Sequence, residues 1–424
     1  MKGSFLTSNQ IATKHLKTQN FFVGLLFIFF IWPFGAFLLA LYHYTKKEYH
    51  LIFVLFTGLY GYFMIAESAG LDLYRVLQMP LAYANLSWGE FFNVIGGIYS
   101  DDPEASVDIY RDIVAFWVSR FTTKGNILTL VFALIYGFVF IKSISVFIEQ
   151  DKKKGLYTGI ILLSFSFIFP MEQVAGVRYA TAAYVFFAGV VKFIETDEKK
   201  YLWFVLGAPL IHFSYLSLVM VFGLFFLIRK FSTAIYFILA TSFILPEFIG
   251  PYIDQFSVIL GGAFEQRANL YLLQREAQND IQQLAWYIRY REVSMFIFSL
   301  MVLAFSRIRA GILQKTRFSE SVFYFSLLVL SLSNFTRTIP HAGYRLQFIF
   351  VMFSTFYLFL LFVENRSNKE VKMLTLLAAP AFFFQIIYGL RNILYTSSPV
   401  LYMGNFITFF ITDFDQSAWA TIFK

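Results

Sequence analysis

The chain has 424 residues, of which 58% are hydrophobic and 14% are charged, and its formal net charge is +8. Because soluble domains carry roughly 25% charged residues, this composition indicates a membrane protein. The absence of cysteine excludes disulfides, thiolate metal sites and cysteine nucleophiles. None of the five histidines is paired at metal-ligand spacing, and no GxxxxGK(S/T) loop is present to cradle a nucleotide. We therefore expect no metal and no other cofactor.

About 20 consecutive apolar residues cross a bilayer as a helix. After a polar, basic tail at 1–20, the chain offers about 12 such runs, some of them short, which predicts an all-α, polytopic membrane protein. The predicted spans are 21–42, 51–69, 126–148, 156–170, 174–194, two within 201–228, 232–249, 292–306, 319–335, 345–363 and 372–388. A run at 399–412 suggests a partial thirteenth span before the C-terminal tail at 413–424. Since no internal repeat is present, residues 21–412 are predicted to form one transmembrane domain.

Two long polar intervals interrupt these spans, at 70–125 and 251–290. Apolar residues recur at helical spacing within 106–121, which predicts an amphipathic helix at the membrane interface. The second interval repeats this pattern in the stretch ANLYLLQREAQNDIQQLAWYIRY. We expect both intervals on the outer side of the membrane.

The apolar run from Tyr201 to Ile228 has 28 residues, which is about 42 Å of helix and too long for one span. A single helix here would turn the basic loop 307–317 outward, against the usual excess of Lys and Arg in cytoplasmic loops. Splitting the run near His212, three residues after the helix-weakening Pro209, places that loop inside. The basic surplus then belongs to cytoplasmic loops rather than to a nucleic-acid patch. The same count leaves the lysine-bearing tail 1–20 outside, which conflicts with this bias.

On this topology, basic residues collect at the outer face. They are Arg75 (beside Asp72), Arg111, Arg178, His212, Arg267, Arg275, Arg289, Arg291, Arg337, His341, Arg345 and Arg391. Short outward loops normally avoid such residues, so the enrichment indicates an anionic partner. The alternative is that each residue only anchors a helix end by snorkelling. In RTIPHAGYR, three basic residues spaced four apart are expected to converge from a turn; a solvated connecting loop is the alternative.

Lipid phosphate or diphosphate fits an outer membrane surface best, because guanidinium groups bind phosphate oxygens in bidentate fashion. Several arginines would stabilise a diphosphate leaving group while a glycosidic bond breaks. A histidine or a carboxylate could take the proton of the attacking hydroxyl. His212 is the candidate for this base or for positioning the substrate, and Asp72 and His341 are rival bases. The candidate diphosphate ligands are Arg75, Arg178, Arg337, Arg345, Arg267 and Arg275.

Four short motifs, in this order, resemble the EpsG family of Wzy-like polymerases of bacterial exopolysaccharide and O-antigen. They are DLYR after the second span, GVRYATA at the start of the fifth, LIHFS after a proline and GYR before a late span. The resemblance implies a GT-C-like glycosyltransferase that joins undecaprenyl-diphosphate-linked oligosaccharide repeats outside the cytoplasmic membrane, without a metal or a nucleotide sugar. By position it carries over Asp72, Arg75, Arg178, His212 and Arg345. The partners that the resemblance implies are the lipid-linked oligosaccharide and membrane lipid. A chain-length regulator and a flippase are compatible with it as further partners.

Two other functions fit parts of the pattern. An O-antigen-ligase-like transferase would use the same donor and pass the glycan to lipid A or protein. A transporter or flippase of lipid-linked sugar would place its polar residues near the bilayer midplane and show internal repeats. The clustering at one face favours an enzyme over a transporter, whereas only the acceptor separates a polymerase from a ligase.

Overall fold

The computed structural model describes residues 23–66, 72–97, 108–151, 155–176, 178–245, 286–337, 342–411 and 416–423. In these ranges the regular elements are helices, and the only extended pairing is an isolated bridge between Met64 and Ser397. The second predicted interfacial stretch, within 251–290, lies almost entirely outside the described residues, as does the tail 1–20.

Within the described residues, five stretches are long and apolar enough to cross a membrane. They are α7 (Gly125–Gln150), Leu156–Val174, α16 (Arg317–Phe335), α17 (Ala342–Glu364) and α18 (Lys369–Tyr395). In the second of these, α8 (Leu156–Ser166) leads into the 3-10 turn η3 (Met171–Gly176). The expectation of an all-α protein with apolar membrane helices is therefore confirmed, while the number of about 12 spans stays a prediction.

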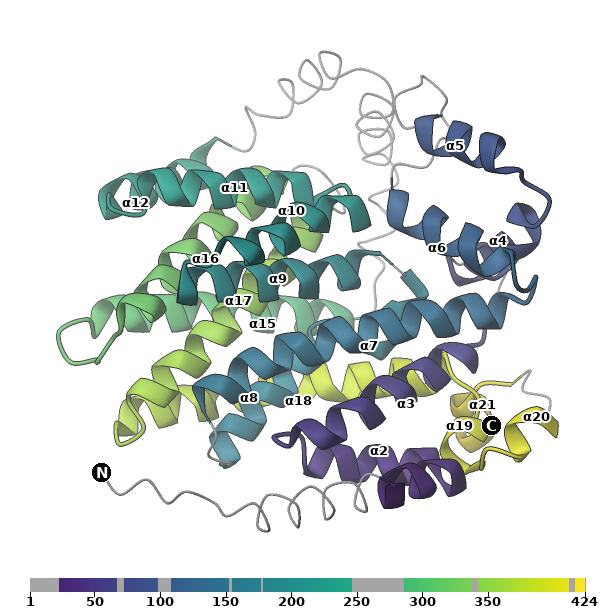
Figure 1. Cartoon of the computed structure of the whole chain (residues 1–424). Coiled ribbons are helices and arrows are strands. Elements are labelled where there is room, and N and C mark those ends of the chain that lie inside the picture. The colour runs from purple at the N-terminus through teal and green to yellow at the C-terminus, as the bar shows by residue number, and fades with distance from the viewer. Residues whose placement is uncertain are drawn as a thin grey trace, which may run out of the picture.

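Helix α17 is the core of the helical body. In an apolar 18-residue stretch of α17, 83% is buried, compared with 39% in the corresponding stretch of α18. Helix α17 is therefore enclosed by other helices, and α18 is largely peripheral. Its neighbours are α8, α16, α18 and α15 (Trp286–Ile308), as Figure 1 shows. A helix that is apolar on all sides is stable in such a position.

The run from Tyr201 to Ile228 is broken where the charge count places the break. Helix α10 (Leu202–Ile211) ends before His212, whose backbone is extended, and α11 (Tyr215–Ile228) begins three residues later. The predicted split is confirmed, although each half is shorter than the roughly 20 residues of a full span. Helix α9 (Tyr179–Thr196) packs between α7 and α10, and α12 (Ser232–Ile244) follows α11 and packs on α16.

The first polar interval folds into three helices at one end of the body, α4 (Asp72–Tyr83), α5 (Trp88–Gly96) and α6 (Ile109–Ser119) (Figure 1). The helix predicted within 106–121 is thus present as α6. Ser87 and Glu90 form a capping box that starts α5. Phe91 of α5 stacks on Phe116 of α6 with ring centres 3.9 Å apart.

Helix α4 is fixed to its neighbours by a close approach and a hydrogen bond. Gly125 permits the backbone of Leu77 to lie so near α7 that a Cβ at position 125 would come within 2.2 Å of the Leu77 carbonyl oxygen. Tyr83 donates a hydrogen bond to Asp112 of α6 at 3.1 Å. Burial, together with the Asp112 carboxylate, raises the pKa of Tyr83, so its hydroxyl stays protonated and keeps donating.

The N-terminal and C-terminal parts of the described chain meet. Helix α2 (Pro33–Tyr42) begins with proline at a position where no backbone donor is lost, and it packs on α3 (His50–Tyr62). Trp32 donates from Nε1 to the Tyr402 carbonyl at 2.8 Å. The apolar run 399–412 forms α19 (Val400–Met403) and α20 (Thr408–Ile411), two short helices rather than the expected partial span. Helix α21 (Ala418–Phe423) follows and packs on α18.

Candidate functional site

Several helix termini gather at the end of the body where α4, α5 and α6 lie (Figure 1). Here α9 and α17 begin and α10 turns into α11. We call this end the arginine face and define it by Asp108, Arg178, His212, Arg291 and Arg345. Each of these residues is described by the structure, and each belongs to a different segment of the chain.

Arg178 and His212 are connected through a carboxylate. The Arg178 guanidinium forms an ion pair with Asp108 through its Oδ2 atom. The other oxygen of Asp108, Oδ1, accepts a hydrogen bond of 2.9 Å from the backbone N–H of Phe213, the residue after His212. Asp108 is buried, whereas Arg178 keeps 22% of its side chain exposed. One buried carboxylate therefore fixes both the guanidinium and the α10–α11 turn.

The ring of His212 is buried and its Nδ1 atom is engaged. The Ser214 backbone N–H donates to Nδ1 at 3.3 Å, and the Ser214 hydroxyl lies 2.9 Å from the same atom. A backbone N–H can only donate, so Nδ1 is the acceptor and the proton of the neutral ring is on Nε2. In this tautomer His212 presents a donor rather than a lone pair at Nε2. A ring in this tautomer can donate a hydrogen bond from Nε2 but cannot accept a proton there.

Tyr179 connects this site to the start of α17. Its hydroxyl donates to the backbone carbonyl of Arg345, and the Arg345 guanidinium lies over the Tyr179 ring, 5.5 Å from its centre. The ring also meets His212 edge to face, with ring centres 5.3 Å apart. Tyr215 donates to the Tyr179 carbonyl at 3.1 Å. Arg345 and His212 thus both contact the ring of Tyr179.

Gly343 of the GYR motif is required for a close approach at the α16–α17 turn. A Cβ at this position would lie 2.8 Å from Arg337 Cα and 2.9 Å from the Thr336 carbonyl oxygen. Both atoms belong to the backbone, so they cannot move aside as a flexible side chain does. The glycine lets α17 begin directly against the end of α16, which sets the position of Arg345.

A second buried polar group lies on the other side of the first turn of α17. Arg291 of α15 donates to the Tyr344 hydroxyl at 3.2 Å, and its guanidinium lies 4.1 Å from the ring centre of Tyr388 on α18. One helical turn further along α18, Asn392 donates to Glu172 of η3 at 3.4 Å. Glu172 is buried, and its Oε2 atom has no hydrogen-bond partner in the described structure.

Sequence reasoning assigned no role to Asp108, Glu172 or Asn392. Glu172 was detectable as an ionisable side chain in the short link between the predicted spans 156–170 and 174–194, because a charge so close to two membrane spans is a candidate for a functional role. Asp108 and Asn392 gave no comparable signal. Their partners are 70 and 220 residues away in the chain, and only the packing of helices brings them together.

The other predicted site residues are distributed as follows. Arg75 is exposed on α4, a helix that packs beside η3, and Arg337 is exposed at the end of α16. Asp72 begins α4, but its side chain is outside the description. His341, Arg267 and Arg275 lie outside the described residues. Among the residues that the structure describes, no three His, Asp or Glu side chains form a group able to hold a metal ion.

These observations define a helical membrane protein with a buried, arginine-containing polar site at the helix ends. The chain belongs to the EpsG family, whose family model matches residues 107–399. This is a family of polysaccharide polymerase-like membrane proteins. The matched range contains every residue that defines the arginine face, and Asp72 and Arg75 precede it. No curated protein and no solved structure matches this chain.

Proposed function

We propose that this protein is a polysaccharide polymerase of the cytoplasmic membrane, with about 12 spans, a GT-C-like architecture and the arginine face turned outward. Its donor is an undecaprenyl-diphosphate-linked oligosaccharide, and its acceptor is a hydroxyl of a second such chain. The observation that carries the proposal is the convergence of Arg178, Arg345 and His212 through Asp108 and Tyr179. Family membership supports the polymerase reaction.

The arginines bind the diphosphate in this reaction. The acceptor hydroxyl oxygen forms a bond to the anomeric carbon of the donor, and the bond between that carbon and the diphosphate oxygen breaks. Negative charge then grows on the diphosphate, and guanidinium groups fixed beforehand stabilise it without reorganisation. Arg178, which Asp108 holds in place, and Arg345, which lies over a neutral ring, are the described residues suited to this role.

His212 positions the substrate and a separate group accepts the proton. With its proton on Nε2, the ring donates a hydrogen bond to a sugar or phosphate oxygen. The proton of the attacking hydroxyl passes to Asp72 or His341, the rival bases that the sequence offers close to the same motifs. The alternatives of a ligase and a flippase differ in what they do with this donor: a ligase transfers it to lipid A or protein, and a flippase moves it unchanged.

The decisive experiment supplies the purified protein with undecaprenyl-diphosphate-linked repeat units as the only substrate. A polymerase produces a ladder of glycans that differ by one repeat, together with free undecaprenyl diphosphate. A ligase forms product only when lipid A or an acceptor protein is added. Consumption of no donor under either condition, in protein that is folded and monodisperse, overturns the enzyme proposal in favour of transport.

A further inference from the structure

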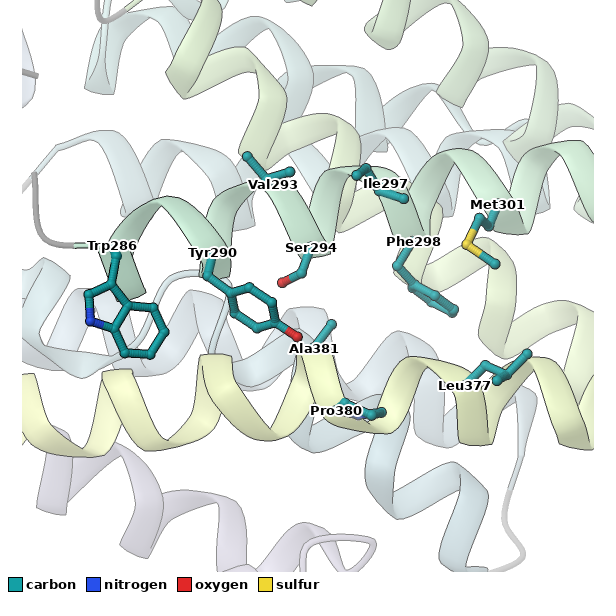
Figure 2. A pocket seen from close by; sticks show the side chains of 10 residues that line it. All are labelled: Trp286, Tyr290, Val293, Ser294, Ile297, Phe298, Met301, Leu377, Pro380 and Ala381. Atoms are coloured by element: carbon teal, nitrogen blue, oxygen red, sulfur yellow. The ribbon is translucent and has the colours of Figure 1, made fainter. Parts of the chain in front are cut away.

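Helix α15 contributes to two cavities of opposite character. Figure 2 shows the larger, a groove of about 590 Å³ between α15 and α18, and the side chains that line it carry no charge. The smaller has a volume of about 180 Å³ and lies where α15 ends and α16 begins, at the end of the helical body opposite the arginine face. We call it the polar cavity, because the residues that line it include Tyr236, Arg307, Lys315, Glu320, Tyr324 and Tyr357.

The volume of the polar cavity limits the size of its ligand. A water molecule takes about 30 Å³ in the liquid, so the cavity has room for roughly six. Pockets for larger organic ligands have volumes of roughly 300–1,000 Å³. A small polyatomic group such as a phosphate therefore fits the cavity, and a larger organic ligand does not.

Two cations line the polar cavity, and most of their donors are available to a ligand. The Arg307 guanidinium lies over the ring of Tyr236, 5.5 Å from its centre. Lys315 lies over the ring of Phe323 and donates one hydrogen bond of 2.8 Å to the Ser306 carbonyl oxygen. In the part of the chain that the structure describes, neither cation forms an ion pair with a carboxylate. An ammonium has three donors and a guanidinium has five.

The Tyr236 hydroxyl is an independent indication of a ligand. Its oxygen is buried and has no hydrogen-bond partner among the described residues. Buried polar groups are nearly always hydrogen-bonded, so one that is not calls for a bound water, ion or ligand. Tyr236 belongs to α12, whereas Arg307 and Lys315 belong to α15 and to the link that follows it. Donors from three segments therefore line one cavity.

Glu320 opposes an anion in the polar cavity but does not balance both cations. It is exposed on α16, and one carboxylate against two cations leaves one positive charge among the lining residues. Glu364 does not line the cavity and accepts hydrogen bonds from Thr316. The pKa of Lys315 is lowered by burial, raised by Glu320, lowered by Arg307 and raised by Glu364, with a net lowering. An anion beside the ammonium would stabilise its charged form.

We propose that the polar cavity binds a phosphate group, with Arg307 and Lys315 bound to its anionic oxygens and the Tyr236 hydroxyl as a third donor. Arginine binds phosphate through its planar fork and lysine binds it as a point charge. Free phosphate and a lipid headgroup share this chemistry. The site lies at the opposite end of α17 from Arg345, so it is separate from the proposed reaction centre. A bound phosphate would connect α12, α15 and the link to α16.

The first test measures binding of inorganic phosphate to the full-length protein in phosphate-free detergent, by equilibrium dialysis at constant ionic strength. Arg307→Gln and Lys315→Met should each weaken binding about 10- to 100-fold, because each removes a charged donor. Tyr236→Phe keeps the ring and removes one hydroxyl, and it should weaken binding about two- to tenfold. Arg309→Gln is the matched control, since Arg309 pairs with Glu370 and does not line the cavity. It should bind as wild type does.

Glu320→Gln should change binding in the opposite direction. It removes the opposing carboxylate and should tighten phosphate binding about two- to fivefold, a gain that a folding defect cannot produce. The second test repeats the series with phosphatidylglycerol, counted by native mass spectrometry, with uncharged diacylglycerol as the reference. If only one of the two probes responds to Lys315→Met and Glu320→Gln, that probe identifies the source of the phosphate group; a response of both means that the site accepts either.

Three results overturn the proposal. The first is that neither probe binds. The second is equal binding by Lys315→Met and Arg309→Gln, which is expected if these cations only anchor helix ends. The third is phosphate binding that Arg178→Lys removes and Lys315→Met leaves intact, since the phosphate would then lie at the arginine face. None of these results depends on polymer formation, so the proposed function can fail while this site stands.

Discussion

The two ends of the helical body differ in what their ion pairs connect. At the end opposite the arginine face, which we call the ion-pair face, cations meet carboxylates: Lys192 with Glu149 and Glu195, Arg366 with Asp151, and Arg309 with Glu370. At the arginine face, Arg345 lies over Tyr179 and Arg291 lies over Tyr388. Cations lie over aromatic rings at the ion-pair face as well, where Arg307 lies over Tyr236 and Lys315 over Phe323.

Asp108 and Arg178 form a carboxylate pair at the arginine face. Asp108 divides its two oxygens between Arg178 and the Phe213 backbone N–H. One oxygen of the carboxylate therefore binds the backbone of the α10–α11 turn. The other holds the guanidinium in a defined position next to the turn that contains His212. The pairs at the ion-pair face join helix ends to one another, while the Asp108–Arg178 pair joins the start of α9 to the α10–α11 turn.

The largest effect is expected for Arg178→Lys. Lysine keeps the charge but loses the planar fork that pairs with Asp108 and that, in the proposed function, also binds phosphate oxygens. We expect the polymerisation rate to fall by about 10²–10³, the range found when one fixed donor to a developing anion is removed. The measurement is the initial rate of ladder formation by purified protein, with thermal unfolding to verify folding. Arg366→Lys at the ion-pair face is the matched control, and a rate loss of the same size there would remove the distinction between the ends.

Asp108→Asn should have the next largest effect. The amide oxygen can still accept from the Phe213 N–H, but the ion pair with Arg178 is lost. Hydrogen bonds to charged groups contribute about 1.5–3 kcal/mol, so we expect a rate loss of roughly 10- to 100-fold. Residues that act together are not additive. The double variant with Arg178→Lys should therefore be little slower than Arg178→Lys alone, and strictly multiplicative losses would show that Asp108 does not act through Arg178.

His212→Gln tests the tautomer argument with a smaller effect. The glutamine amide can replace one donated hydrogen bond, so turnover should stay within about tenfold of wild type, and its pH profile should not change. Loss of a general base costs about 10²–10⁴ in rate instead. His212→Ala, which removes the donor altogether, should be slower than His212→Gln. A loss of the larger size in both variants, with an altered pH profile, would identify His212 as the base and contradict its Nε2–H assignment.

The sequence predicts the parts of this architecture that depend on local pattern. Composition identifies the membrane class, while Pro209 and the charge of the loop 307–317 locate the break at His212. Helical spacing identifies α6. The site contacts depend instead on tertiary packing, because Asp108 reaches Arg178 across 70 residues and Arg291 meets Tyr388 across two helices. No local pattern encodes such a pairing.

The groove between α15 and α18 shows the same limit. Most of its wall residues lie in two apolar runs, at 292–306 and 372–388, that are each typical of an ordinary membrane helix, and Trp286 and Tyr290 precede the first run. The sequence gives no reason to expect a cavity there, since the cavity arises from how the two helices sit against each other. The surroundings of the 3-10 turn that contains Glu172 also depend on how the helices pack. Its neighbour Gly389 on α18 lies so close to Phe167 that a Cβ would come within 2.4 Å of the ring.

The smallest effect is expected at the ion-pair face, from exchanging the partners of the pair between Arg309 and Glu370, which lie 3.0 Å apart. Both side chains are about 40% exposed, and exposed pairs of this kind contribute only about 0–1 kcal/mol. Arg309→Glu alone should destabilise the protein slightly by placing two like charges together, and the exchanged pair Arg309→Glu with Glu370→Arg should recover wild-type stability. The polymerisation rate should stay the same in both, because neither residue lies near Arg178. A loss of polymerisation rate that the exchanged pair does not restore would mean that the ion-pair face also takes part in the reaction. The functional difference between the two ends would then be wrong.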